Sequence, residues 1–236
     1  MSRWGRSLAF LLVAVLLGGV SGCFGITQNP SYFPYLLPTG DYVRTHAKPI
    51  GPGYEKDEAE RIASQRGWLI ARDGSKWRRV VPSPRPVAVL ETRVVELLVQ
   101  NGVIVICCGG GGIPVIERHD GSMVGIEAVI DKDLSSALLA RQLGADHLLL
   151  LTDVDAVYLD WNTRDAVAVA RAGIKALDPE DFDRGSIGPK IEAAIGFAAE
   201  TGKPASIGRL EDAMAILAGH SGTRIDVGVH GLTLRT

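Results

Sequence analysis

Cysteines, basic clusters and long apolar segments are all scarce in this sequence of 236 residues. Its three cysteines show no CxxC or Cys/His spacing of the kind that binds zinc, and we expect no protein-bound metal. The 25 basic and 27 acidic residues give a formal charge of -2, and no run of Lys and Arg could neutralise a series of phosphates. These absences argue against nucleic acid as a partner and favour a small, locally charged ligand.

One apolar run is present near the amino terminus, at residues 8–20. It is shorter than the about 20 apolar residues that cross a bilayer. Two arginines precede it and small residues lead to Cys23, a pattern typical of a bacterial lipoprotein signal peptide. We therefore expect residues 1–22 to be a signal peptide, Cys23 to carry lipid, and residues 23–46 to be an irregular tether. The alternative is a mis-started or fused leader.

Helical and strand patterns alternate along the rest of the chain. Residues 57–65 predict a helix that stops at Gly67, and residues 68–71 and 76–81 predict a β-hairpin. Beyond Pro86 the predicted helices are at 90–101, 133–143, 189–200 and 210–217, and the predicted strands at 103–108, 147–151, 204–207 and 223–227. This alternation predicts a three-layer α/β/α sandwich around a mainly parallel sheet. Residues 160–184 have no assigned structure.

The segment 103–108 is continuously apolar, which predicts a strand buried on both faces. The helix before it should turn Val94, Leu97 and Leu98 inward. Strand geometry sends neighbouring side chains to opposite faces, so we expect Cys107 and Cys108 to be buried small hydrophobes that do not bridge each other.

Three motifs at predicted strand or helix ends can carry chemistry. The first is a run of four glycines directly after residue 108, whose backbone N–H groups can form an anion-binding nest; its members are Gly109, Gly110, Gly111 and Gly112. The second is Asp133 at the start of a predicted helix, where it could also be a simple N-cap. The third is the group Thr152, Asp153 and Asp155 after a predicted strand, where open α/β sheets bind ligands or where a turn is merely capped.

Lys190 is the most informative single residue. It follows Pro189, which suits the first position of a helix, and so lies among free N–H groups at the positive end of the helix dipole. A lysine is unfavourable there unless an anion, such as a transferring phosphoryl group, binds beside it. The alternative is an exposed lysine without a role.

Six segments together resemble the carbamate kinases, members of the amino acid kinase superfamily, in that family's order and approximate spacing. They are residues 48–52 (KPIGP), 77–84 (WRRVVPSP), 108–114 (CGGGGIP), 128–133 (AVIDKD), 151–155 (LTDVD) and 188–192 (GPKIE). The resemblance covers residues 47–224. It implies an amino-terminal lobe for the acyl acceptor, a carboxyl-terminal lobe for ATP, and a small projecting subdomain at 47–86, with residues 87–236 forming the kinase core.

The resemblance also implies a reaction and roles. The reaction is reversible phosphoryl transfer between ATP and carbamate, giving ADP and carbamoyl phosphate, with Mg²⁺ on the nucleotide, as part of arginine metabolism. By this likeness Lys190 stabilises the phosphoryl group, Asp133 orients the lysines and Lys48 closes over the phosphates. The four glycines face carbamate, and the nucleotide is bound by Thr152, Asp153, Asp155, Tyr158, Lys190 and His220.

Two departures from the family pattern accompany the resemblance. The family begins with a strand and a Gly-Gly-Asn turn, for which no counterpart precedes Lys48, so we expect an incomplete amino-terminal lobe, slow transfer and a sheet edge that favours pairing with a second chain. His220 stands where the family usually has a more basic residue. Two alternatives stay open: a nucleotide-binding remnant on a lipoprotein anchor, and another acyl or amino-acid kinase of the superfamily. The kinase-like part implies a cytoplasmic location, which conflicts with the leader.

Overall fold

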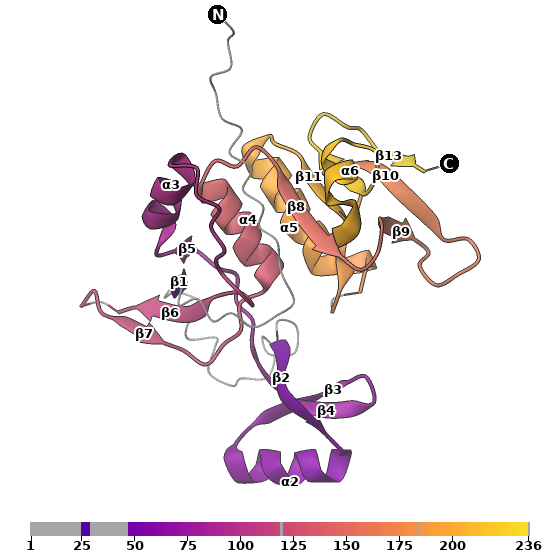
Figure 1. Cartoon of the computed structure of the whole chain (residues 1–236). Helices are drawn as coiled ribbons and strands as arrows, with labels where there is room; N and C mark the ends of the chain where they lie inside the picture. The colour runs from indigo at the N-terminus through magenta and orange to yellow at the C-terminus, as the bar shows by residue number, and fades with distance from the viewer. Residues whose placement is uncertain (1–24, 29–46, 119, 184, 236) are drawn as a thin grey trace, which may run out of the picture. The chain divides into compact units, whose positions relative to one another are not determined.

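The computed structural model describes residues 25–28, 47–118, 120–183 and 185–235 (Figure 1). The expected signal peptide, Cys23 and most of the expected tether lie outside these residues. The chain divides into two compact units. One contains Gly25–Ala88 and Ile113–Asp131, and the other contains Val89–Gly112 and Lys132–Thr236.

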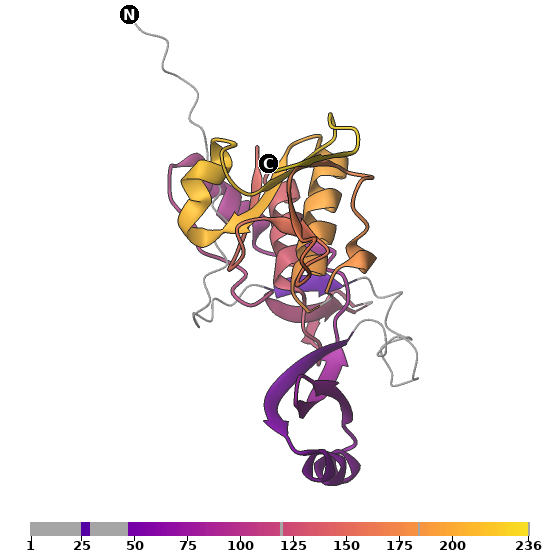
Figure 2. The same cartoon turned by 90° about the vertical axis from the view of Figure 1, so that its right-hand side faces the viewer.

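The first unit holds a small antiparallel sheet with one helix. Strands β2 (Ala47–Tyr54), β4 (Lys76–Pro82) and β3 (Leu69–Asp73) lie in the order β2-β4-β3, and α2 (Lys56–Arg66) packs on β4 (Figure 2). The helix ends at Gly67, whose φ of 66° suits a left-handed cap. The predicted helix and hairpin are therefore confirmed.

A second sheet of this unit has the strand order β5-β1-β6-β7. Its strands are β5 (Ala88–Val89), β1 (Gly25–Gln28), β6 (Ile113–Glu117) and β7 (Met123–Gly125). Strand β1 runs parallel to β6, and β7 runs antiparallel to it. The expectation of an irregular tether over 23–46 is therefore wrong for β1, because β6, far away in the sequence, supplies its backbone partner.

The second unit is built on a mixed sheet in the order β13-β10-β12-β11-β8, with β9 paired to β10. The strands are β8 (Leu148–Thr152), β9 (Val157–Leu159), β10 (Val167–Gly173), β11 (Ala205–Arg209), β12 (Thr223–Asp226) and β13 (Leu232–Leu234). The pairs β8/β11 and β10/β12 are parallel, whereas β11/β12, β10/β13 and β9/β10 are antiparallel. Strand β10 occupies part of the stretch left without assigned structure.

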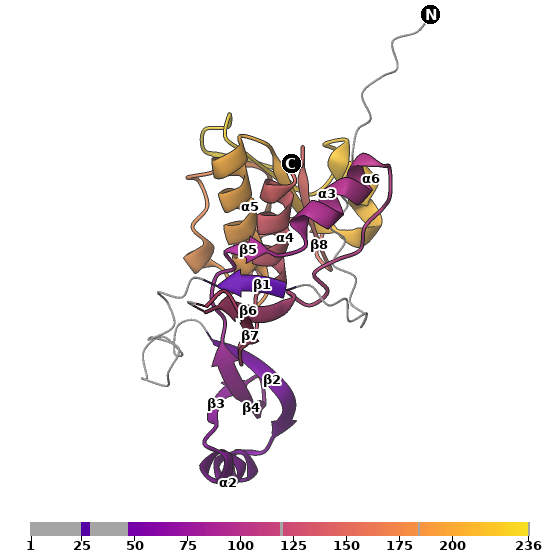
Figure 3. The ribbon, with the colours of Figure 1, turned by 90° about the vertical axis from the view of Figure 1, so that its left-hand side faces the viewer.

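Helices cover both faces of this sheet, which confirms the α/β sandwich. Helices α4 (Lys132–Gln142) and α5 (Ile187–Thr201) pack along each other and on one face (Figure 3), where they share a core with Leu148 and Leu150. Helix α6 (Ala213–Leu217), entered through the 3-10 turn η3 (Leu210–Asp212), packs with Leu149 and Leu151. Successive strand residues point to opposite faces, so the two groups of helices lie on opposite sides of β8.

Helix α3 (Thr92–Gln100) and the segment after it depart from expectation. Val95 is 1% exposed, whereas Val94 and Leu97 are 59% and 60% exposed, so the inward face was predicted wrongly. Residues 103–108 form no strand, and Ile104 and Ile106 are 85% and 73% exposed. A strand needs a neighbour for its backbone groups, and within the described residues no strand pairs with this segment.

His147 marks the entrance to β8. Its Nε2 lies 2.9 Å from the Ser206 hydroxyl on β11. Burial of the ring, and then the positive charge of Arg224, lowers the pKa of His147 to about 4. The imidazole is therefore held neutral by its environment.

Candidate functional site

Lys190 and Asp133 form a buried ion pair in the second unit. The Lys190 Nζ lies 3.1 Å from Oδ1 and 3.0 Å from Oδ2 of Asp133, and the two side chains are 7% and 3% exposed. Asp133 is the second residue of α4 and Lys190 the fourth of α5. The two helices pack against each other, and both contribute alanines to the same core; these are Ala137, Ala140, Ala193, Ala194 and Ala198. Core packing therefore sets the distance between the two charges.

The start of α5 differs in one detail from the prediction. The helix begins at Ile187, so Pro189 is its third residue rather than its first. Proline is still tolerated there, because the first four N–H groups of a helix have no partner within it. Lys190 remains in the first turn, near the positive end of the helix dipole, as predicted.

Lys48 and Asp131 form a second ion pair, within the first unit. The Lys48 Nζ on β2 lies 2.7 Å from Asp131 Oδ2, and the side chains are 30% and 6% exposed. Only Lys132 separates Asp131 from Asp133 in the sequence. The role of Asp131 was missed in the sequence, where the D-K-D pattern was the available signal but Asp133 alone was selected.

The four glycines form a turn that is fastened to α4. Positive φ values of 45°, 131° and 88° at Gly109, Gly111 and Gly112 explain why glycine suits these positions. The Gly111 N–H donates to the Cys108 carbonyl at 2.8 Å. The buried Ser135 hydroxyl, two residues after Asp133, donates to the Gly111 carbonyl at 2.9 Å. Ser135 was also missed, because nothing local in the sequence links it to the turn.

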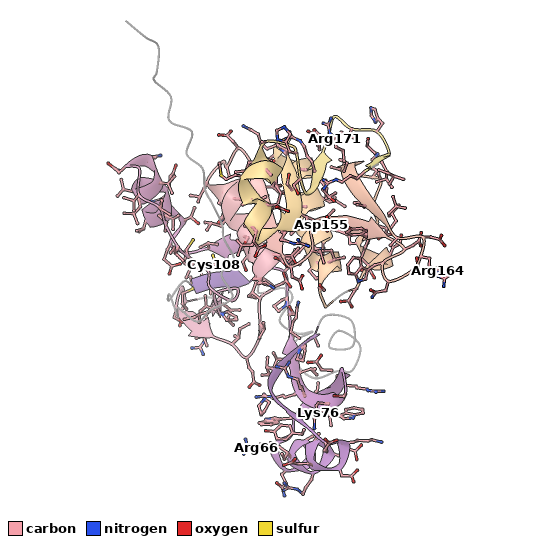
Figure 4. All side chains as sticks on the ribbon, turned by 45° about the vertical axis from the view of Figure 1, so that its right-hand side comes forward. Arg66, Lys76, Cys108, Asp155, Arg164 and Arg171 are labelled. Atoms are coloured by element: carbon pink, nitrogen blue, oxygen red, sulfur yellow. The ribbon has the colours of Figure 1, made fainter. Side chains whose placement is uncertain are left out.

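Polar groups gather beyond the end of β8. The Thr152 hydroxyl donates to Asp153 at 3.0 Å, and the Tyr158 hydroxyl donates to Asp155 at 3.0 Å. Figure 4 labels Asp155 on the loop after β8. Burial and then the Asp155 carboxylate raise the pKa of Tyr158. The Asp155 and Tyr158 side chains are therefore hydrogen-bonded to each other.

Two arginines near this group were not predicted. Arg209 ends β11 directly beside Thr152 in the parallel pairing, and Arg235 donates to the Gly222 carbonyl at 2.6 Å. Both guanidinium groups are close enough to Tyr158 to oppose the rise in its pKa. They supply positive charge at the edge of β8 and β11. For Arg209, the signal in the sequence was a basic residue just after the predicted strand at 204–207.

His220 was also predicted to contact the nucleotide. It is exposed after α6, where its backbone N–H donates to Ala215 at 2.8 Å. Within the described residues no hydrogen bond or ion pair joins the His220 side chain to Asp155 or Tyr158. Its predicted contact with nucleotide phosphates therefore stays a prediction.

Gly208 allows the loops around this edge to approach one another. A Cβ at this position would lie 2.7 Å from Ile216 Cδ1, 3.0 Å from Gly222 Cα and 3.1 Å from the Asp155 carbonyl. Two of these neighbours are backbone atoms that cannot yield easily. The close approach holds the Asp155 loop against β11.

No cluster of three or more His, Cys, Asp or Glu in the described part of the chain could hold a metal ion. None of its helices combines the length and apolar character that crossing a membrane requires.

The amino acid kinase family model matches residues 56–209, which include both ion pairs except Lys48, the glycine turn and the polar group after β8. The chain belongs to the amino acid kinase family. The carbamate kinase of Haemophilus influenzae is 50% identical over 186 residues, which are 79% of this chain and 60% of that protein. The carbamate kinase of Escherichia coli K12 is 47% identical over 178 residues, or 75% of this chain and 59% of that one.

Solved structures of the same kind are similar in fold. A protein from Aeropyrum pernix K1 gives a TM-score of 0.76 at 39% identity, covering 88% of this chain and 65% of its own. A carbamate kinase from Giardia lamblia bound to AMP-PNP gives 0.72 at 36% identity, covering 87% and 64%. The chain spans about 60% of the length of the curated relatives it matches.

Proposed function

We propose that this chain is a carbamate-kinase-like phosphotransferase, which transfers a phosphoryl group reversibly between ATP and carbamate. The observation that carries the proposal is the buried pair of Lys190 and Asp133 at adjacent helix starts. A cation kept in place by a carboxylate can meet negative charge as it develops on a transferring phosphoryl group, without reorganising first. The similarity to carbamate kinases supports carbamate as the acceptor, with a role in arginine metabolism.

The proposed roles follow the groups described above. Lys190 stabilises the phosphoryl group, and Asp133 positions Lys190. Lys48, positioned by Asp131, closes over the phosphates from the subdomain at residues 47–86. The glycine turn faces carbamate, and the core at 87–236 holds the nucleotide.

We assign the nucleotide contacts to residues at and after the carboxyl ends of β8 and β11. Thr152, Asp153, Asp155 and Tyr158 line the pocket in this proposal, with His220 toward the phosphates. The G. lamblia relative bound to AMP-PNP supports a nucleotide ligand. Magnesium enters as part of the nucleotide substrate, because Mg²⁺ commonly binds substrate phosphates with only one or two protein carboxylates.

The test starts from ADP and carbamoyl phosphate and follows ATP formation. Lys190→Met should lower the rate by about 10²–10³, the usual effect of removing one preorganised donor. Lys203→Met is the matched control, because Lys203 forms an exposed pair with Asp146 in the same unit. Turnover unchanged by Lys190→Met would remove Lys190 from the mechanism. Faster turnover with acetyl phosphate than with carbamoyl phosphate would favour another acyl kinase of the family.

A second candidate is nucleotide binding without transfer. Ile104 and Ile106, which precede the glycine turn, are exposed. The part of the chain proposed to face carbamate is therefore less completely packed than the strands around β8, which favours nucleotide binding without transfer. Calorimetry with MgADP separates the two. Binding without turnover would support this candidate, and absence of binding by the folded chain would contradict both.

Two further parts of the proposal concern the amino-terminal leader and the oligomeric state. We infer that the segment before Cys23 directs lipidation of that cysteine in a bacterial host, although the kinase-like part is expected where ATP is held. Fractionation of wild type and Cys23→Ser decides this, since identical soluble behaviour would show that the leader is inert.

We also infer a homodimer, which sedimentation would reveal as twice the chain mass.

A further inference from the structure

Cys107 and Cys108 do not have the arrangement that a strand would impose. Residues 103–108 are not a strand, and Cys108 has a φ of 63°, a value rare outside glycine. This backbone lacks the strand geometry that would send the two side chains to opposite faces, and each thiol influences the pKa of the other. The strand from which opposite faces were expected is therefore absent.

The two sulfurs have different environments. Cys107 is partly exposed, whereas Cys108, labelled in Figure 4, is 4% exposed. The hydrogen bond from Cys108 lowers the pKa of Cys107, although burial opposes the effect. The same bond and burial raise the pKa of Cys108 far above its usual range. Cys107 is thus the accessible nucleophile, and Cys108 is the buried thiol beside it.

We propose that Cys107 and Cys108 are a redox-modification site, at which a small hydroperoxide closes a reversible disulfide between adjacent residues. The Cys107 thiolate attacks the peroxide, so that an S–O bond forms, the O–O bond breaks, and the alkoxide or hydroxide leaves and takes up a proton. The Cys108 sulfur then displaces the hydroxyl of the Cys107 sulfenic acid. The S–S bond forms, water is released, and the two sulfurs have together lost two electrons to the peroxide.

The chain geometry makes this bridge easy to reduce. Adjacent Cα atoms are about 3.8 Å apart across a trans peptide, which is below the about 4.4–6.8 Å of ordinary disulfides. A ring closed over so short a span is strained, and strained disulfides have more oxidising potentials. Thiols such as glutathione would therefore reopen it, as a switch requires.

The bridge would also disturb the glycine turn. The Cys108 carbonyl accepts from Gly111, and the Gly111 carbonyl accepts from Ser135 on α4. Closing the ring reorients the Cys107–Cys108 peptide and with it that carbonyl. We expect both hydrogen bonds to weaken on oxidation. This effect does not depend on the phosphotransfer proposed above.

The test uses the full chain with Cys23→Ser, which leaves only these two of the three cysteines. After limited hydrogen peroxide treatment, thiols that react with iodoacetamide in denaturant should fall from two to none. The monomer mass should decrease by two hydrogen atoms, and dithiothreitol should restore both thiols. Retained thiols, added oxygen atoms as the main product, or a disulfide-linked dimer would overturn the proposal.

Two further measurements remove the simplest alternative, which is ordinary reactivity of neighbouring thiols. The bridge should form faster in the folded chain than in urea, and Cys107→Ser should protect Cys108 from the same peroxide treatment. Hydrogen exchange should increase on oxidation across residues 108–112. Equal rates in urea, or rapid oxidation of Cys108 without Cys107, would show that the fold does not build the site.

Discussion

Replacing Lys190 with methionine should destabilise the second unit strongly. Methionine keeps most of the volume of the side chain but removes its charge, and Asp133 is then left in a site where its side chain is 3% exposed. At 3.0 Å and an effective dielectric constant of about 20, the lost attraction is about 5–6 kcal/mol. Much of this is offset because lysine no longer needs to be desolvated, so a net loss of about 3 kcal/mol is expected.

The assay is urea unfolding, with hydrogen exchange in β8 and α5 used to follow this unit by itself. Lys203→Met, at a pair whose side chains are 46% and 71% exposed, should cost no more than about 1 kcal/mol. Adding Asp133→Asn to Lys190→Met should recover about 2 kcal/mol, as interacting sites do in a double-mutant cycle. Equal destabilisation by Lys190→Met and Lys203→Met would refute the view that burial makes the first pair important.

Three smaller predictions address the same unit. Gly208→Ala should lower the free energy of unfolding by about 1–3 kcal/mol, because the new Cβ would clash with backbone atoms. Gly110→Ala is the control: a Cβ there meets nothing within 4 Å, and the change should cost less than about 1 kcal/mol. Equal effects of the two changes in thermal unfolding would contradict this prediction. His147→Gln should reduce the loss of stability between pH 6.5 and 4, by about 1–2 kcal/mol after allowing for partial exposure, because the unfolded ring gains a proton at a higher pH than the folded one. His220→Gln is its exposed control, and identical pH profiles of wild type and His147→Gln would exclude the effect. Tyr158→Phe should cost about 1 kcal/mol through its lost hydrogen bond, and an unchanged urea midpoint would show that the bond contributes nothing.

Local patterns predicted the elements whose partners are near in sequence or whose burial is complete. The hairpin of β3 and β4 has a two-residue turn between its strands, so its pairing needs no distant information. Strand β8 and helix α5 are buried on several sides, and their apolar patterns reflect that burial directly. The α/β fold followed from these elements.

The wrong predictions share a physical cause: whether these segments form strands depends on partners that are distant in the sequence. Residues 103–108 have the composition of a buried strand, but composition cannot supply the neighbour that would accept its backbone hydrogen bonds. Strand β1 is the reverse case, since β6 gives order to a segment with no clear pattern. Among the charged residues predicted for the site, the structure pairs Lys190 with Asp133, and their chemical roles stay predictions. The pairing of Lys48 with Asp131 was not predicted, because the two residues are 83 positions apart in the sequence.

The two ion pairs are held in different ways, and this difference bears on the proposed chemistry. Lys190 and Asp133 lie near the starts of α5 and α4, two helices that pack against each other and share one core, so their separation is a consequence of core packing. Lys48 is 30% exposed on a strand of a small sheet, with less apolar material to restrain it. A residue that stabilises developing charge benefits from rigidity, whereas one that closes over a ligand must be able to move. This difference supports the proposal of charge stabilisation for Lys190 and of closure for Lys48.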